Sequence, residues 1–203
     1  MRCFLTAAAL ALTLATPAYA APVDAPSGKY EADLSHTSVT WRVKHLGLSN
    51  YTARFARIAS TVQLDAANPA NSKLSVTIDA NSVRTDFPFT DKVDFDKELG
   101  SGDKWLNGAK FPQITFVSTG ITVTGATTAK ITGDLTLRGV TKPVVLDAVL
   151  NGTTKPNPIM GPERIGVSAR TVIKRSAWGM DYGTQFVGDD VDLAIEAEYK
   201  LVK

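Results

Sequence analysis

Strict alternation of polar and apolar residues is the feature that most limits how this chain can fold. It is clearest at positions 38–44, which read S-V-T-W-R-V-K. Because a β-strand turns successive side chains to opposite faces, Val39, Trp41 and Val43 must share one face. His45 falls at the same parity just after the run. One face of this strand is therefore expected to meet an apolar interior and the other to meet water.

Comparable runs rich in Val, Ile, Thr and aromatic residues recur along the chain, separated by short turn-forming segments. They predict strands at 28–34, 37–45, 55–64, 74–78, 113–122, 128–137, 143–152, 165–174 and 190–201. Many strands with so little helix indicate an all-β fold, either a sandwich or a closed barrel. Short connections favour antiparallel neighbours, and closure would remove exposed sheet edges. We therefore expect an antiparallel barrel of about eight strands, wide enough to hold one small ligand.

One segment, 90–105, departs from the strand pattern. Thr90 can cap a helix, and Phe95 and Leu99 fall four residues apart on one face of it. Glycines at 100 and 102 interrupt this helix, and Ser101 can cap a second short turn. The pattern predicts two short helices that cover one end of the barrel.

Residues 1–20 carry the pattern of a cleaved export signal. Arg2 gives a positive start, positions 4–15 are almost wholly apolar, and A-Y-A at 18–20 supplies a small-x-small cleavage site. The apolar run is too short to span a bilayer, and no later segment is apolar enough to do so. We expect cleavage after position 20, a flexible leader at 21–27, one domain at 28–203 and residence in the periplasm.

Cysteine content and charge narrow the class of partner. Cleavage would remove the single cysteine, Cys3, so the mature chain would depend on its core without disulfides. The 203 residues carry 22 basic and 20 acidic side chains, with no long block of either sign. This balance gives no reason to expect nucleic acid or an anionic membrane surface as a partner. The expected partner is a small apolar molecule, and both a monomer and a homodimer stay open.

Several short strings occur in a specific order from Tyr30 to Glu198. Together they resemble the YceI-like family of bacterial, usually periplasmic, polyisoprenoid-binding proteins. The resemblance implies a lipocalin-like antiparallel barrel with a long apolar channel for an isoprenoid or another lipid tail. The strings are Tyr30-x-x-Asp33-x-x-His36-x-Ser38-Val39, V-K-H-L-G-L-S at 43–49, Arg54-Phe55, Ser82-Val83-x-Thr85, Phe111-Pro112-x-Ile114-x-Phe116-x-Ser118, G-D-L-T-L-R-G-V-T-K-P-V at 133–144, and I-K-R-S-x-x-G-M at 173–180.

The sequence departs from the family pattern at three places. Ala177 stands where an acidic residue is usual, Gly100 replaces a usual basic residue, and Trp105-Leu106 replaces an aromatic pair. The end of the pocket near the expected helices is therefore expected to accept a different ligand or head group.

Residues expected to line the channel are of two kinds. Residues of the first kind sit at inward positions in their strands, as Leu193 and Ile195 also do, and the alternative for them is that they fill the barrel as an ordinary core. Residues of the second kind are aromatics in loop or helix segments, where they form either a mouth or a packed lid. The expected lining residues are Trp41, Val43, Val76, Ile78, Phe87, Phe89, Phe95, Trp105, Ile114, Phe116, Leu135, Leu137, Trp178 and Met180.

Three polar residues are candidates for head-group or structural contacts: His36, His45 and Arg175. The histidines are predicted to lie far apart on opposite faces, and without cysteine partners or an H-E-x-x-H string we expect no metal site. Arg175 is expected to pair with Asp33, Asp181 or Asp189. No catalytic residue is assigned, because the chain has no G-x-S-x-G string and no cysteine nucleophile outside the predicted export signal.

The leading functional hypothesis is a non-enzymatic protein that carries, buffers or sequesters an isoprenoid or related long-chain lipid in the periplasm. A quinone-like molecule would suit the same channel, and no other cofactor is expected. One alternative is a filled barrel that acts in stress protection or interaction without a ligand. A weaker alternative is a lipid-ester hydrolase that uses Ser49 with His45, two residues that lack a named orienting acid.

Overall fold

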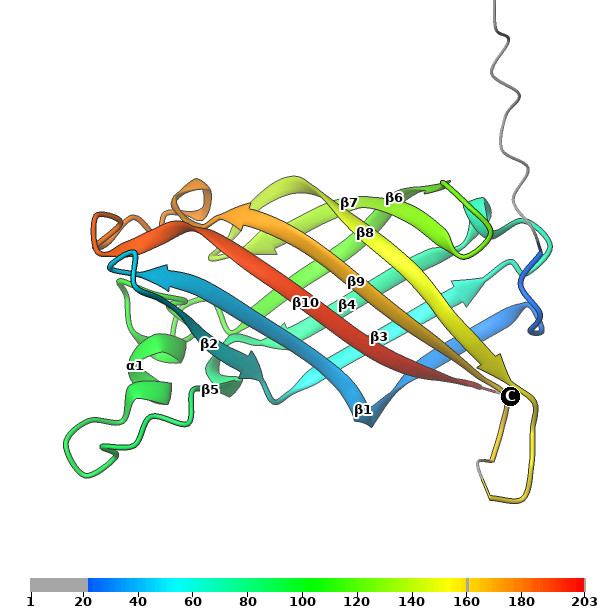
Figure 1. The fold of residues 1–203 in the computed structure, drawn as a ribbon, viewed down its shortest axis with the longest axis horizontal. Helices are drawn as coiled ribbons and strands as arrows, with labels where there is room; N and C mark the ends of the chain where they lie inside the picture. The colour runs from blue at the N-terminus through cyan, green and yellow to red at the C-terminus, as the bar shows by residue number, and fades with distance from the viewer. Residues whose placement is uncertain (1–21, 160, 203) are drawn as a thin grey trace, which may run out of the picture.

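Antiparallel strands wind into a barrel in the computed structural model, which describes residues 22–159 and 161–202 (Figure 1). In the described chain, eight strands run in the order β10-β9-β8-β7-β6-β4-β3-β1, and β1 pairs with β10 to close the ring. The predicted all-β antiparallel barrel is confirmed. The strands are β1 (Gly28–His45), β2 (Ser49–Phe55), β3 (Ile58–Leu64), β4 (Lys73–Asp79), β5 (Val83–Arg84), β6 (Gln113–Val123), β7 (Thr128–Leu137), β8 (Val140–Thr154), β9 (Arg164–Lys174) and β10 (Val187–Leu201).

The long first strand, β1, differs from the prediction of two strands broken at Ser35 and His36. It runs through 18 residues because β10 pairs with both halves, on either side of an irregularity in register between Ala32 and Thr37. The half before this point also pairs with β3, and the half after it pairs with β2. Figure 1 shows the resulting sharp bend in β1, whose two halves pair with β3 and β2 in turn while β10 follows both.

The predicted strand at 55–64 is also wrong at its start. The chain forms β2, a strand the prediction lacked, and then turns a corner at Ala56 and Arg57 before β3. The corner is held by the Ala56 N–H, which donates to the Ser82 carbonyl at 2.9 Å, and by the Asp79 N–H, which donates to the Arg57 carbonyl at 3.1 Å. These bonds direct β2 to the short strand β5 and β3 to β4.

Only one α-helix forms in the described residues, α1 (Phe95–Ser101), where the sequence predicted two. Its N-cap is Asp94 rather than Thr90: the Asp94 carboxylate accepts the Lys97 N–H at 3.0 Å. Residue 101 ends this helix instead of starting another. Gly100 lets α1 lie against the 3₁₀ helix η2 (Ala80–Ser82), since a Cβ there would lie 3.1 Å from the Ala80 carbonyl oxygen.

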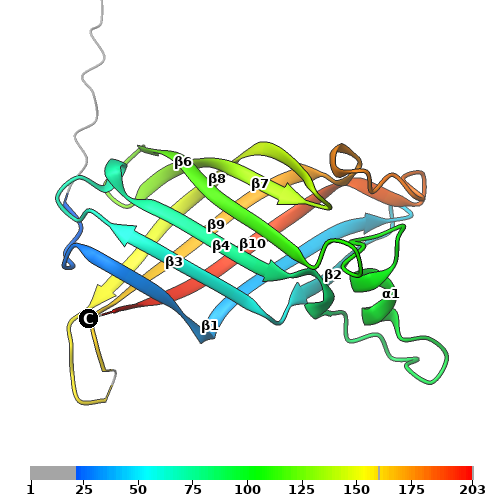
Figure 2. The same cartoon turned by 180° about the vertical axis from the view of Figure 1, so that it is seen from behind.

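The two ends of the barrel are built differently, as Figures 1 and 2 show. One end, here called the α1 end, carries α1, the β1–β2 hairpin and the 3₁₀ helix η3 (Arg175–Trp178) with the loop that leads to β10. The other end, the terminal end, carries the C-terminus, the 3₁₀ helix η1 (Pro69–Asn71) and the loop between β8 and β9. No helix among the described residues is long and apolar enough to cross a membrane.

A buried cluster closes the terminal end. It comprises Tyr30, Leu64, Ala66, Ile165, Ala197 and Tyr199. Part of the expected leader packs on this cluster: the Val23 N–H donates to the Ala66 carbonyl at 2.9 Å, and Tyr30 donates its hydroxyl to the Pro26 carbonyl at 2.8 Å. The predicted export signal lies outside the described residues.

An ion-pair cluster sits at the bend of β1. The buried Asp33 carboxylate lies 2.8 Å from Lys200 Nζ and 2.6 Å from Arg164 Nη1, and it accepts the Ser35 hydroxyl at 2.7 Å. The same Arg164 nitrogen lies 3.0 Å from Glu198. The cluster ties the bend of β1 to β9 and β10, and its hydrogen bonds, from Lys200 first, hold the pKa of Asp33 far below its usual range.

Replacing Asp33 with Asn should lower the free energy of unfolding by roughly 3 kcal/mol at pH 7, because two cations then lose their shared carboxylate. A depressed carboxyl pKa stabilises the folded state above the unfolded pKa of about 4, and this contribution is lost as pH falls below it. The difference between wild type and Asp33→Asn should therefore shrink between pH 5 and pH 2, as checked by urea unfolding at several pH values.

Glu31→Gln is the matched control on the same strand. The Glu31 carboxylate pairs with Lys29 at 2.7 Å, but both side chains are about half exposed, so its loss should change stability little. A difference for Asp33→Asn that stayed constant with pH would contradict this account of the bend.

Candidate ligand-binding cavity

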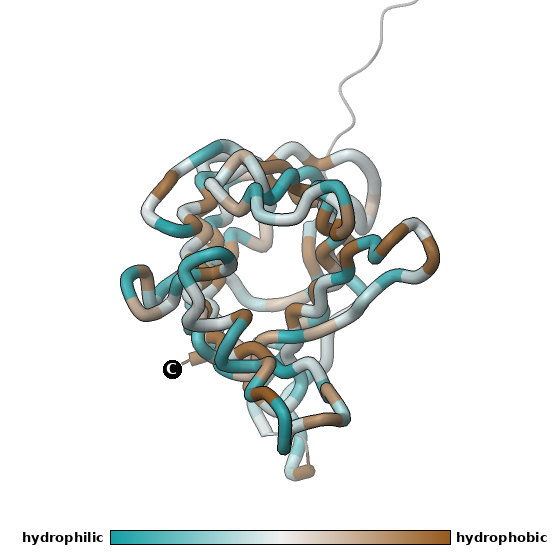
Figure 3. Tube along the Cα trace, turned by 90° about the vertical axis from the view of Figure 1, so that its left-hand side faces the viewer, coloured by the Kyte–Doolittle hydropathy of each residue, from teal (hydrophilic) through white to brown (hydrophobic). Residues whose placement is uncertain are grey.

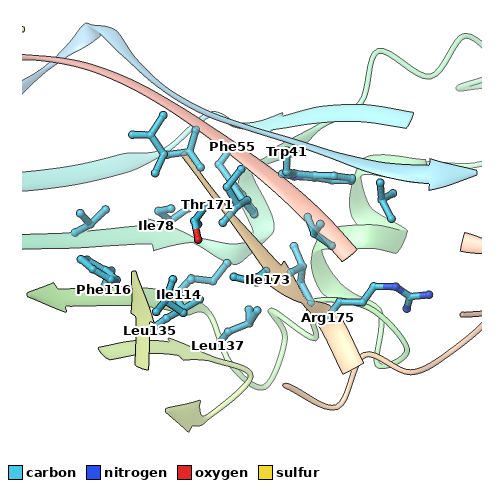
Figure 4. A pocket seen from close by; sticks show the side chains of 18 of the residues that line it. Trp41, Phe55, Ile78, Ile114, Phe116, Leu135, Leu137, Thr171, Ile173 and Arg175 are labelled. Atoms are coloured by element: carbon cyan, nitrogen blue, oxygen red, sulfur yellow. The ribbon is translucent and has the colours of Figure 1, made fainter. Parts of the chain in front are cut away.

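A cavity of about 520 Å³ lies inside the barrel, and its lining is almost entirely apolar. Figure 4 shows side chains from separate strands converging on it, with Arg175 at one end and Phe116 toward the other. Among the described residues that line it, the polar ones are His45, Tyr51, Thr171, Arg175 and Tyr199, apart from the ring nitrogens of its tryptophans.

Strand parity explains which side chains face this cavity. Every residue assigned an inward position from alternation lines it, including Leu193 and Ile195, so the parity prediction is confirmed. Several of these inward side chains, such as Trp41 and Val76, are only partly buried although they lie inside the barrel. The interior is therefore hollow at their level and not filled by core side chains.

Small inward side chains on β9 help to keep the interior open. Val167, Ala169 and Thr171 project into it at consecutive inward positions, where larger residues would reach further across. An eight-stranded barrel is just wide enough for side chains to fill its interior or for one small ligand to occupy it. Short side chains along one wall favour the second outcome.

The cavity is closed at the terminal end and accessible at the α1 end. Tyr199 and Ala197 lie both in its lining and in the buried cluster that closes the terminal end. At the α1 end its lining includes exposed His45 and the half-buried Phe87 and Trp105. We call this α1-end opening the mouth.

Most residues predicted to line a channel do line the cavity, and two do not. Phe89 is 52% exposed on the loop before α1, outside the lining. Trp178 is buried among core residues, with its indole N–H directed to the Leu135 carbonyl at 3.4 Å. The lining residues among the predicted set are Trp41, Val43, Val76, Ile78, Phe87, Phe95, Trp105, Ile114, Phe116, Leu135, Leu137 and Met180.

Sequence reasoning missed part of the lining. Tyr51 and Phe55 face the cavity from β2, a strand that the prediction did not contain. Tyr51, Ala53 and Phe55 alternate with polar residues, and this alternation was a usable signal for an inward-facing strand. Val144 and Leu146 also line the cavity from β8, where the alternation V-V-L-D-A at 144–148 carried the same signal.

The Tyr51 hydroxyl is the one buried side-chain polar atom that makes no hydrogen bond within the described chain. Its ring packs edge-on against Phe95, with ring centroids 5.9 Å apart. By contrast, the Tyr199 hydroxyl at the closed end is paired with the Ser60 hydroxyl at 2.9 Å. A buried, unpaired hydroxyl in an apolar cavity is available to an oxygen atom of a ligand.

Arg175 is buried beside the mouth and is held by backbone carbonyls, not by the carboxylates that were expected. Its guanidinium donates to the carbonyls of Met180 (2.6 Å), Tyr182 (2.9 Å), Val187 (2.7 Å) and Gly188 (2.9 Å). Burial lowers the pKa of this group. Arg175 thus anchors the loop before β10 and places a positive charge near the cavity, with the negative charges of Asp189 and Asp181 acting on it from nearby.

The expected carboxylate partners have other roles. Asp189 accepts the Ser176 N–H at 2.8 Å and the Ser176 hydroxyl at 2.9 Å, which fixes the start of η3. Asp33 belongs to the ion-pair cluster at the bend of β1. No bond between Asp181 and Arg175 is present within the described chain.

The two histidines lie in unrelated places. His45 is exposed at the mouth, opposite Ser49 in the hairpin register, and no hydrogen bond joins their side chains in the described structure. His36 lies at the bend of β1 with Asp33 and Glu198, close enough together for the three to share a cation. Those carboxylates already face Arg164, which weakens the case for a metal there.

Comparison with known proteins supplies independent evidence. A model of the YceI-like domain matches residues 30–199. The YceI protein of Escherichia coli O157:H7 is 38% identical over 170 residues, which cover 84% of each chain. A crystal structure of the Campylobacter jejuni YceI protein aligns with a TM-score of 0.67 and 32% identity over 79% of this chain and 90% of that one.

A polyisoprenoid binding domain from Saccharophagus degradans shares the fold at 15% identity, with a TM-score of 0.57 over 87% of this chain and 100% of that one. The hollow barrel, the matched span and the identity to YceI proteins agree with one another. The chain belongs to the YceI-like family.

Proposed function

We propose that this protein binds one isoprenoid or related long-chain lipid inside its barrel and acts in the periplasm as a carrier, buffer or sequestering protein. The observation that carries the proposal is the hollow, almost wholly apolar interior, closed at one end and accessible at the other. The family and the polyisoprenoid binding domain with the same fold support it. The periplasmic location rests on the predicted export signal.

The length of the lipid tail decides how tightly such a site binds it. Burial of about ten methylene-sized groups offers roughly 8 kcal/mol of gross transfer free energy. Association itself costs about 4–15 kcal/mol, so a short tail would gain little net affinity. A long prenyl chain offers enough surplus, which makes a long isoprenoid a better ligand than a short fatty acid.

Polar groups beside the mouth suit a ligand with one polar end. The Tyr51 hydroxyl has a free donor, and Arg175 contributes positive charge. A prenyl alcohol or quinone oxygen would satisfy the hydroxyl while the tail extends toward Tyr199. Only the orientation of the ligand needs these contacts, since the tail supplies most of the affinity.

The competing functions have weaker support. A barrel that acts without a ligand needs no hollow interior, yet inward residues such as Trp41 remain partly exposed to the cavity. A hydrolase that uses Ser49 and His45 lacks a bond between the two side chains in the described structure and an acid that orients the histidine.

Lipid extraction tests the proposal directly. Protein purified from its native periplasm, extracted with organic solvent and analysed by mass spectrometry, should release about one long isoprenoid per chain. Repeated recovery of empty protein would remove the main support for lipid binding.

A space-filling variant shows whether that lipid sits inside the barrel. Ala169→Trp places a large ring in the cavity and should displace about three methylene-sized groups, weakening affinity roughly fiftyfold while leaving the fold intact. Val172→Trp, on the same strand but facing outward, is the control. Equal retention of lipid by both variants, with unchanged circular dichroism, would place the ligand elsewhere.

Tyr51→Phe separates head-group contact from tail burial. Since the Tyr51 hydroxyl is unpaired, its removal should leave the stability of delipidated protein unchanged or raise it by about 1 kcal/mol. Binding of a prenyl alcohol should fall about fivefold, whereas binding of a hydrocarbon of equal length should not change.

Tyr199→Phe is the matched control for that variant. It breaks the bond to Ser60 and should lower the melting temperature. An alcohol affinity that Tyr51→Phe left unchanged would show that this hydroxyl does not contact the ligand.

A further inference from the structure

Exposed apolar side chains gather around the mouth. Leu46 and Leu48 lie on the β1–β2 hairpin and are 53% and 85% exposed, and Phe186 on the loop before β10 is 57% exposed. The hairpin and this loop are neighbours, because the Leu46 N–H donates to the Phe186 carbonyl at 2.7 Å. Phe89 and Tyr182 complete the group, and these two with Phe186 are all the exposed aromatic residues in the described chain. Figure 3, which faces this end, shows hydrophobic segments in its loops.

The backbone at Leu46 makes this exposure harder to explain by folding alone. Leu46 has φ of 51° and Gly47 has φ of 72°, the left-handed region that hairpin turns usually fill with Asn or Asp followed by Gly. A leucine there is strained, and more than half of its surface stays exposed. The turn gains nothing from a leucine at this tip and the core gains little, which points to a contact outside the chain.

Two series of aromatic rings connect the cavity wall with the exposed rim. From Tyr51 the first passes through Phe95 and Phe87 to Phe89, with successive ring centroids 5.9, 5.0 and 5.6 Å apart. The second joins cavity-lining Trp105 to exposed Tyr182, 5.6 Å away. The apolar lining of the cavity therefore continues to the outer surface of the mouth.

Each of the two exposed ends of these series carries a lysine. Lys92 Nζ lies 5.0 Å from the centre of the Phe89 ring, and Lys104 Nζ lies 4.5 Å from the centre of the Tyr182 ring. An aromatic ring beside a lysine suits the boundary of a phospholipid bilayer, where the ring lies among the head groups and the ammonium meets phosphate. Acidic residues such as Asp91 and Asp181 also occur on these loops, so apolar insertion must supply most of the binding.

We infer that the mouth docks on a phospholipid bilayer by inserting Leu46, Leu48, Phe89, Tyr182 and Phe186 into its interfacial layer, with Lys92 and Lys104 against lipid phosphates. This inference rests on the proposed function, because a lipid that enters the cavity would pass from the bilayer through the mouth without crossing water. Bulk charge alone did not indicate such a surface. The residues lie on three separate loops around an opening, an arrangement that suits a deformable bilayer better than one rigid protein partner.

The test is sedimentation of the protein with vesicles of phosphatidylethanolamine and phosphatidylglycerol in a 3:1 ratio. The triple variant Leu46→Asn/Leu48→Asn/Phe186→Asn should bind these vesicles at least about tenfold more weakly than wild type. Because Asn suits the left-handed conformation at position 46, the single variant Leu46→Asn should keep or raise the melting temperature while it weakens binding. Weaker vesicle binding by a more stable protein cannot result from unfolding.

The control variant Leu34→Asn/Ile159→Asn removes two apolar side chains away from the mouth, 69% and 93% exposed, and should bind vesicles as wild type does. Lys92→Gln and Lys104→Gln should each reduce binding about fivefold on these anionic vesicles and have little effect on pure phosphatidylcholine. Lipid held in the cavity at equilibrium, measured by extraction, should be the same in all of these variants, because none of the substituted side chains lines the cavity.

Equal losses in the mouth and control variants would overturn the docking surface. Failure of the wild type to bind any vesicle would also overturn it and leave a protein as the partner of these loops. Vesicle binding by a protein whose cavity proves empty would uphold the docking surface and contradict the proposed lipid cargo, so the two proposals fail separately.

Discussion

Closure of the sheet by pairing of β1 with β10 is the constraint on which the rest of the structure depends. Once the ring is closed, the alternating side chains of every strand are divided between an inside and an outside, and inward residues have no other face to pack against. Whether the inside is solid or hollow then depends on side-chain volume. The short side chains of Val167, Ala169 and Thr171 on β9 do not reach across the interior, which leaves a cavity of about 520 Å³.

The difference between its two ends makes this hollow barrel a candidate for ligand binding. The terminal end is closed by buried Tyr30 and Tyr199 and strengthened by the ion pairs of Asp33 at the bend of β1. At the α1 end the lining reaches exposed His45, Arg175 holds the loops through backbone carbonyls, and an unpaired Tyr51 hydroxyl faces the cavity. One end of the barrel therefore stabilises the fold, and the opposite end gives access to the cavity.

Alternation in the sequence was sufficient to predict the all-β barrel and the inward face of Trp41, Val76 and their counterparts, because parity is a local property of a strand. It did not reveal the corner at Ala56 and Arg57, which is held by hydrogen bonds to residues far along the chain, and Tyr51 was missed with it. Nor did it distinguish a hollow interior from a filled one, since the same residue types form both. The carbonyl partners of Arg175 were equally hidden, because backbone carbonyls leave no mark in the sequence.

We propose that the interior holds one extended apolar chain. A crystal structure of protein purified without delipidation tests it most directly, through the electron density inside the barrel. The density should be continuous and elongated, and should run from Tyr51 at the mouth to Tyr199 at the closed end, in contact with Trp41 and Phe116 on the way. Separate peaks of water along the same path, or side chains that move in to fill the space, would contradict it.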